Sequence, residues 1–213
     1  MNIIFFEANH DEETLQVHRA RRLVYSGMAN GATGELFGED ATAEGLKSEI
    51  RIAPGCRLIS AMGHGVTRRF FGHRNQIVTD ISDTRSLESY LKFRVLHLYS
   101  CLTAYRLGPE LIEKGLHAFI GYDARVALAS SPEIEQIFVA VSLAIDQSIL
   151  DDDSELQTFE KAKQAHEQGL SELTASPHVK PDDIAAFEQN FNALKGPWID
   201  SGLYGRYQRA TQS

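Results

Sequence analysis

Three stretches decide the fold: RLISAMGHG (residues 57–65), RVLHLYSC (94–101) and HAFIGY (117–122). Each contains a short, continuous apolar run of the kind that forms a buried strand. The first run leads into His64 and the second into Cys101, each beside a small residue. Segments with helical patterns separate the runs. This alternation predicts a mostly parallel α/β sheet flanked by helices.

The segments around these runs continue the alternation. Residues 3–6 form another apolar run of strand length. Ser131, Pro132 and Glu133 predict a helix start, with an N-cap, a proline in the first turn and an early acid. The remaining elements that we expect are helices at 11–25, 43–50, 83–93 (capped by Asp83 or Thr84) and 109–114, a glycine-rich mobile loop at 27–38, and a small hairpin at 70–79.

The last third of the chain has a different pattern. Residues 154–173 and 182–194 predict two helices, and Gly196-Pro197 ends the second. We therefore expect an α/β core over residues 1–150. A C-terminal helical extension over residues 151–213 is expected to pack on that core.

Composition narrows the class of protein. The chain has 213 residues, 43% hydrophobic and 23% charged, which is ordinary for one large soluble domain. Its net charge of -8 argues against nucleic acid or an anionic membrane as a partner. Two cysteines are too few for a secreted disulfide framework, and no leader or apolar run of about 18 residues occurs. We expect a cytoplasmic protein.

His64 and Cys101 are the residues most suited to chemistry. In an open parallel sheet, ligands gather just past the carboxyl ends of the strands. His64 lies two residues past one expected strand and Cys101 two residues past the next. If these strands are neighbours, an imidazole lies near a thiol and can activate it as a nucleophile. The alternative is a buried cysteine and an unrelated loop histidine.

Small residues beside this pair favour acyl chemistry. Gly65 has no Cβ, so its N–H can approach a ligand closely. Together with the Cys101 N–H, it would form an oxyanion hole. Ser100 is small enough to let a substrate backbone come near.

The segment from Arg57 to Tyr122 resembles the caspase-like cysteine peptidases, which include caspases, clostripain, gingipains, separase and bacterial CHAT domains. The resemblance rests on Gly63-His64-Gly65 and on the Ser100-Cys101 strand end, whose surroundings are closest to the CHAT pattern. It implies a three-layer sandwich with a central, mostly parallel sheet. It also implies a cysteine endopeptidase with His64 as general acid and base, Cys101 as nucleophile, and the Gly65 and Cys101 N–H groups as the oxyanion hole.

The match departs from the family in its specificity positions. Caspases carry Gln-Ala-Cys-Arg-Gly, whereas this chain has Ser100 and Leu102 around the cysteine, so an acidic P1 preference is not implied. Clostripain-type enzymes often have Asp two residues before the cysteine, and here that residue is Tyr99. Cleavage after Arg or Lys is therefore not implied either.

Charged residues near the site are candidates for substrate binding. Asp123 and Arg125 follow the third strand and could contact a charged substrate side chain, or pair with each other or face water. Arg68 follows the His-Gly turn. With Arg69 and Arg74 it gives the rim a positive charge, suited to an acidic substrate segment or simply to solvent.

The remaining candidates are two carboxylates that could support the imidazole of His64, a second thiol and a second imidazole. Asp80 or Asp83 could orient His64 by a hydrogen bond. Cys56 begins the strand that leads to His64, about 20 Å from the reactive end, so a bridge to Cys101 is not expected. His97 lies within a strand and is expected to be a core histidine.

We expect no metal or organic cofactor, because no recognised zinc, P-loop or dinucleotide motif is complete. The partners expected are a protein or peptide substrate and a regulatory protein. Because the first strand begins almost at Met1, we expect control by that partner or by ordering of residues 27–38, not by removal of a long pro-segment. A non-enzymatic caspase-like interaction module in a regulatory or defence complex remains the alternative. A related thiol hydrolase or acyltransferase is a third option.

Overall fold

The structure is a computed structural model of the chain, and it describes residues 2–29, 31–82, 87–199 and 203–205. Its centre is a six-stranded sheet in the order β2-β1-β3-β7-β8-β9. The first five strands in that order are parallel to their neighbours, and β9 is antiparallel to β8. The strands are β1 (Ile3–Glu7), β2 (Gly34–Phe37), β3 (Leu58–Met62), β7 (Val95–Tyr99), β8 (Ala118–Tyr122) and β9 (Leu194–Lys195).

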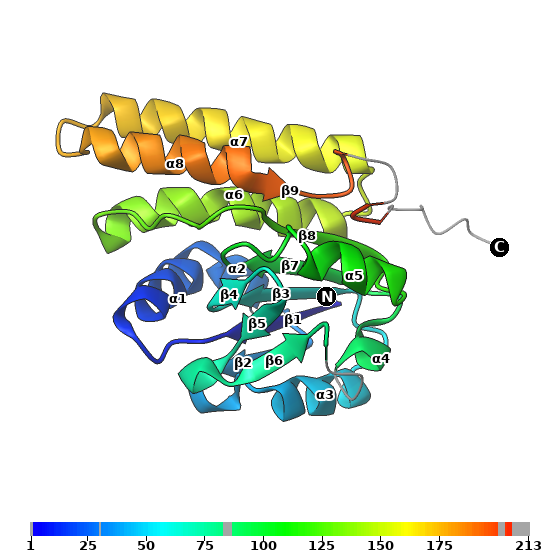
Figure 1. The fold of residues 1–213 in the computed structure, drawn as a ribbon. Helices are drawn as coiled ribbons and strands as arrows, with labels where there is room; N and C mark the ends of the chain where they lie inside the picture. The colour runs from blue at the N-terminus through cyan, green and yellow to red at the C-terminus, as the bar shows by residue number, and fades with distance from the viewer. Residues whose placement is uncertain (1, 30, 83–86, 200–202, 206–213) are drawn as a thin grey trace.

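Helices cover both faces of this sheet (Figure 1). On one face lie α1 (Glu12–Val24) and α6 (Pro132–Leu150), and α7 (Glu155–Ala175) and α8 (Pro181–Ala193) stack beyond α6. On the other face lie α3 (Ala43–Ile52), α4 (Glu88–Leu91) and α5 (Leu107–Glu113). The prediction of a central, mostly parallel sheet flanked by helices is confirmed.

The continuous apolar runs form strands because both faces of the sheet are buried. In β1, Ile3 and Phe5 pack into the core under α1 and α6, while Ile4 and Phe6 pack into the core under α3. Successive side chains of a strand point to opposite faces, so a strand between two helical layers is buried at every position and consists mostly of apolar residues.

A second, small antiparallel sheet follows the turn after β3. It consists of β4 (Gly65–Val66), β5 (Arg69–Phe71) and β6 (Ile77–Asp80), in that order. The 3-10 turn η2 (His73–Asn75) joins β5 to β6. The predicted hairpin at 70–79 is therefore the later part of a three-stranded unit that begins beside His64.

The prediction of a mobile loop at residues 27–38 is wrong. This range overlaps α2 (Ser26–Ala29) and contains the edge strand β2, which pairs with β1 from Ile4↔Gly34 to Glu7↔Phe37. The 3-10 turn η1 (Gly38–Asp40) follows. The short strand has no long apolar run, because an edge strand buries little: Leu36 is buried while Glu35 is exposed. Control through ordering of this segment loses its basis.

The C-terminal segment also contributes to the sheet. The two predicted helices are present as α7 and α8, but Leu194 does not belong to the second one. It begins β9, which pairs with β8 through Tyr122↔Leu194. Two residues of strand carry no periodicity, so the pattern could not reveal them.

Other helix boundaries shifted modestly. Within the described part of the helix expected at 83–93 lies the single turn α4, and the cap predicted at Asp83 or Thr84 lies outside the described residues. The helix expected at 109 begins at Leu107. Ser131 caps α6 as predicted, its side chain accepting a hydrogen bond from Ile134 N. Within the described ranges, no helix is long and apolar enough to cross a membrane.

Candidate active site

His64 and Cys101 emerge at matching points of neighbouring strands. β3 pairs with β7 in parallel, and the last pair in register is Met62↔Tyr99. His64 and Cys101 each lie two residues beyond that pair. Both therefore leave the sheet at its carboxyl edge, side by side, as the spacing of the two motifs predicted.

The two residues line one cavity. Its other walls come from the first turns of α1, the ends of β3 and β7, and the segment after β8. The lining residues are Glu13, Thr14, Val17, Met62, Gly63, His64, Tyr99, Ser100, Cys101, Val126 and Leu128. The cavity is thus mostly apolar, with the imidazole, the thiol and one carboxylate as its reactive groups, a composition typical of small binding sites.

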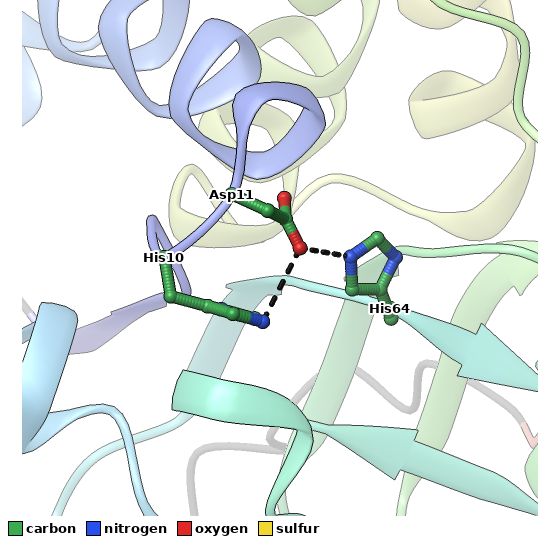
Figure 2. A group of neighbouring side chains, drawn as sticks. All are labelled: His10, Asp11 and His64. Atoms are coloured by element: carbon green, nitrogen blue, oxygen red, sulfur yellow. Dashed lines mark hydrogen bonds and ion pairs between the residues drawn. The ribbon is translucent and has the colours of Figure 1, made fainter.

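Asp11 holds the imidazole of His64. His64 Nε2 lies 2.6 Å from Asp11 Oδ2 (Figure 2). A carboxylate at Nε2 fixes the tautomer that donates there and leaves the Nδ1 lone pair free to accept a proton. Nδ1 lies 4.0 Å from Glu13 Oε2, and Glu13 is part of the cavity wall.

The helix start of α1 holds Asp11 in turn. Asp11 is the N-cap residue, and its Oδ1 accepts hydrogen bonds from Thr14 N at 2.9 Å and Thr14 Oγ1 at 2.7 Å. Burial alone would raise the pKa of Asp11, but the hydrogen bonds from Thr14 and His64 outweigh it and lower the pKa to about 2. The carboxylate is therefore charged throughout the neutral range, where it stabilises a protonated imidazole.

The backbone around Cys101 is tightly fixed. Leu102 has a φ of +60°, a left-handed conformation that is uncommon for a residue other than glycine. Its N–H donates to Ala124 O at 2.9 Å, and Val126 N donates to Cys101 Sγ at 3.3 Å. The segment after β8 thus orients both the thiol and the turn that carries it.

Gly65 allows β4 to pack directly against the Cys101 turn. A Cβ on Gly65 would lie 2.2 Å from Ser100 Oγ and 2.6 Å from Cys101 O, which no side chain can do. Phe71 N donates to His64 O at 2.9 Å, so in this antiparallel pair Gly65↔Phe70 is the non-hydrogen-bonded position. The Gly65 N–H therefore points away from β5.

Ser100 lies between these elements with its hydroxyl uncommitted. The residue is 2% exposed, and its Oγ makes no hydrogen bond within the described residues. It lines the cavity next to Cys101. The hydroxyl is enclosed beside Gly65, since a Cβ added to Gly65 would lie 2.2 Å from it.

The three charged residues predicted to bind substrate lie outside the cavity lining. Asp123 pairs with Lys195 Nζ at 3.3 Å and borders a separate shallow hollow against α8. Arg125 is exposed, and its carbonyl accepts from Gln189 Nε2 at 3.4 Å. Arg68 is also exposed.

The predicted positive rim is partly neutralised. Arg69 Nε lies 2.5 Å from Asp80 Oδ2, and Arg74 lies 3.9 Å from Glu39. Asp80 is thus engaged by Arg69 and by Ser82, so its predicted role in orienting His64 is wrong. Asp83 lies outside the described residues.

The other thiol and the strand histidine are structural. Cys56 and Cys101 are both free, and burial raises the pKa of the Cys56 thiol to about 11. Cys56 also donates to Leu58 O at 3.2 Å. His97 is buried, with Nδ1 2.7 Å from Asp146 Oδ1. Neither residue lines the cavity of His64 and Cys101.

Sequence reasoning missed the contributions of α1 and of the segment after β8. Asp11 stands at the start of α1, just beyond the β1 strand that neighbours β3. That position at the carboxyl edge of the sheet was a usable signal. Glu13, Val126 and Leu128 carry no motif, because their place in the cavity depends on how α1 and the 123–130 segment fold over the sheet edge.

No protein-family model matches the chain, and no curated protein matches it. Among solved structures, the chain is similar to a secreted cysteine protease from Bacteroides thetaiotaomicron, "iotapain", at 14% identity and a TM-score of 0.40. The match covers 58% of this chain and 52% of that protease, so the chain spans about half of its length. A likeness at this level assigns no activity, and the function rests on the chemistry of the site.

Proposed function

We propose that this chain is a cysteine endopeptidase of the caspase-like type, and that Cys101 and His64 form its catalytic dyad. One observation carries the proposal. The thiol and the imidazole leave adjacent parallel strands at the same level and line one cavity, while a charged carboxylate holds the far nitrogen of the imidazole. This is the arrangement that nucleophilic catalysis by a thiol requires: nucleophile, base and a group that orients the base.

The reaction begins with proton transfer from Cys101 Sγ to His64 Nδ1. The thiolate then attacks the carbonyl carbon of the scissile peptide bond, and the carbonyl oxygen becomes an oxyanion. The N–H groups of Gly65 and Cys101 donate to that oxyanion. Support comes from Gly65, whose N–H points away from β5 while its Cα packs against the Cys101 turn.

His64 next gives its proton to the leaving amine, and the peptide bond breaks to leave a thioester on Cys101. Water, deprotonated by His64, attacks the thioester and releases the carboxylic acid and the free thiol. Asp11 remains charged throughout, keeps Nδ1 directed to the reaction and stabilises the imidazolium between the two proton transfers. No metal or organic cofactor takes part in these steps.

Ser100 lines the cavity beside Cys101, and this position supports a contact with the substrate backbone there. Asp123, Arg125 and Arg68 lie beyond the cavity lining and would contact only parts of a peptide distant from the scissile bond. Glu13 adds a carboxylate to the cavity wall.

The test is labelling by a thiol-reactive electrophile with a reporter group. Wild type should be labelled at Cys101, Cys101→Ala should lose the label, and His64→Ala should label at least tenfold more slowly at neutral pH. Cys56→Ala is the matched control and should label as the wild type does. A Cys101 that is labelled equally fast with and without His64 would instead support the non-enzymatic interaction module.

A further inference from the structure

A second cluster of ligating side chains surrounds Asp11, on the side of His64 that faces away from the proposed reaction. His10 follows β1, Asp11 caps α1, and His64 follows β3 (Figure 2). One nitrogen of each histidine and one oxygen of Asp11 all lie within 4.8 Å of one another. Asp11 Oδ2 is 2.6 Å from His64 Nε2 and 3.2 Å from His10 Nε2.

His10 lacks the hydrogen bonds that a buried imidazole normally makes. Its side chain is only 9% exposed, yet neither ring nitrogen makes a hydrogen bond within the described residues. The contact of Nε2 with Asp11 lacks hydrogen-bond geometry despite its length of 3.2 Å. Buried imidazole nitrogens are normally satisfied, so a nitrogen directed at a carboxylate without bonding to it indicates a missing partner between them.

The donor set matches that of a transition-metal site. Two imidazole nitrogens with one carboxylate oxygen bind Zn²⁺ in open sites and Fe²⁺ in facial triads. Bonds of about 2.0–2.1 Å around a tetrahedral zinc place neighbouring ligand atoms roughly 3.3–3.5 Å apart. The distance from Asp11 Oδ2 to His10 Nε2 is already close to this value, and the distance to His64 Nε2 would increase by less than about 1 Å.

The Asp11 carboxylate is already oriented for binding a metal ion. Asp11 Oδ1 is held by Thr14 N and Thr14 Oγ1, which leaves Oδ2 directed at the two histidines. A hydrogen-bonded ligand of this kind is the usual support around a metal centre. Asp11 and His64 are each about one-third exposed, so an ion can reach the cluster from solvent.

We propose that His10, Asp11 and His64 form a binding site for a divalent first-row transition metal, for which Zn²⁺ is the probe. The site shares His64 with the proposed dyad. A metal on Nε2 leaves the remaining proton of the neutral imidazole on Nδ1. In that state His64 cannot accept the proton of Cys101, so the bound metal inhibits. This last consequence rests on the proposed function, whereas metal binding itself does not.

The site is tested by titrating the full chain with Zn²⁺ against a chromophoric chelator. One Zn²⁺ should bind wild type and Cys101→Ala alike, and His10→Gln should weaken binding at least tenfold. His178→Gln, an exposed histidine in the α7–α8 connection, is the matched control and should bind as wild type does. Unchanged binding in His10→Gln, or loss in Cys101→Ala, would overturn the site, the second result by assigning the ion to the thiol.

A measurement on the wild-type chain tests the site even if the His10→Gln variant misfolds. In protein labelled with ¹⁵N-histidine, one equivalent of Zn²⁺ should shift the Nε2 signals of His10 and His64 and leave those of His178 in place. Shifts confined to other histidines would refute the ligand set, whatever the variants do.

The inhibitory consequence has its own readout, the alkylation rate of Cys101 in a Cys56→Ala background. Saturating Zn²⁺ should slow alkylation at least tenfold, and in His10→Gln the same Zn²⁺ concentration should slow it far less. Full zinc occupancy with an unchanged rate would refute the coupling. A Cys101 that is unreactive even without zinc would count against the proposed peptidase, while the titration would still decide the metal site.

Discussion

The interaction between Asp11 and His64 gives the sharpest prediction about reactivity. Asp11→Asn removes the charge but keeps the shape, and asparagine caps helices as well as aspartate does, so α1 should remain folded. The variant retains an oxygen for Thr14 N and loses the carboxylate that faces His64 Nε2 at 2.6 Å. The imidazolium that forms when Cys101 ionises then lacks its counter-charge.

The size of the effect follows from the exposure of the pair. A hydrogen bond to a charged group contributes about 1.5–3 kcal/mol when buried. The Asp11 and His64 side chains are 35% and 32% exposed, so solvent screening reduces this to about 1 kcal/mol. At 1.4 kcal/mol per factor of ten, the alkylation rate of Cys101 at neutral pH should fall about fivefold.

The assay is the pH dependence of alkylation by a small neutral electrophile, followed by mass spectrometry. The Asp11→Asn profile should move to higher pH, because the ion pair forms less readily. Asp80→Asn removes a comparable carboxylate that pairs with Arg69 instead, and it should leave the profile unchanged. An Asp11→Asn profile that overlays the wild type would refute the role of Asp11 as the group that orients His64.

Three further predictions concern packing, the second thiol and acid stability. Gly65→Ala places a methyl group within 2.6 Å of Cys101 O. It should lower the free energy of unfolding, measured by denaturant titration, by about 1–3 kcal/mol and slow the alkylation of Cys101. A stability equal to that of wild type would contradict the close packing of β4. Cys56, whose pKa burial raises to about 11, should stay unlabelled at pH 8 in the native chain, and labelling there at the rate of Cys101 would refute its assignment as structural. Burial would raise the pKa of Asp80, but hydrogen bonds from Ser82 and the charge of Arg69 lower it to about 2. The carboxylate therefore stabilises the fold fully above about pH 4, and this contribution is lost as the pH falls through 2. The free energy of unfolding of Asp80→Asn should vary less over that range than that of wild type, and an identical pH dependence would count against this pairing.

The sequence predicted the fold where burial left a strong pattern. The strands β1, β3, β7 and β8 are buried at every position because helices cover both faces of the sheet, so their runs are mostly apolar. β2 and β9 escaped prediction because they are short edge strands that bury little. Their pairing is decided by tertiary contacts and not by local periodicity.

The same contrast holds for the site. His64 and Cys101 each lie two residues past their strand, a spacing that can be read from the sequence. This spacing correctly predicted that both residues lie at one edge of the sheet. The group that orients His64 could not be chosen by proximity in sequence. Asp80 and Asp83 are nearer along the chain, but Asp11, which is 53 residues away, meets His64 because β1 and β3 are parallel neighbours.

Peptide cleavage tests the central claim most directly. The purified chain, freed of metal by a chelator, should be incubated with a mixed peptide library, and new termini should be counted by mass spectrometry. The account predicts new termini with wild type and Cys56→Ala, and none above background with Cys101→Ala or His64→Ala. Cleavage that persists in Cys101→Ala, or an intact library beside a wild-type Cys101 that the electrophile labels fully, would contradict it.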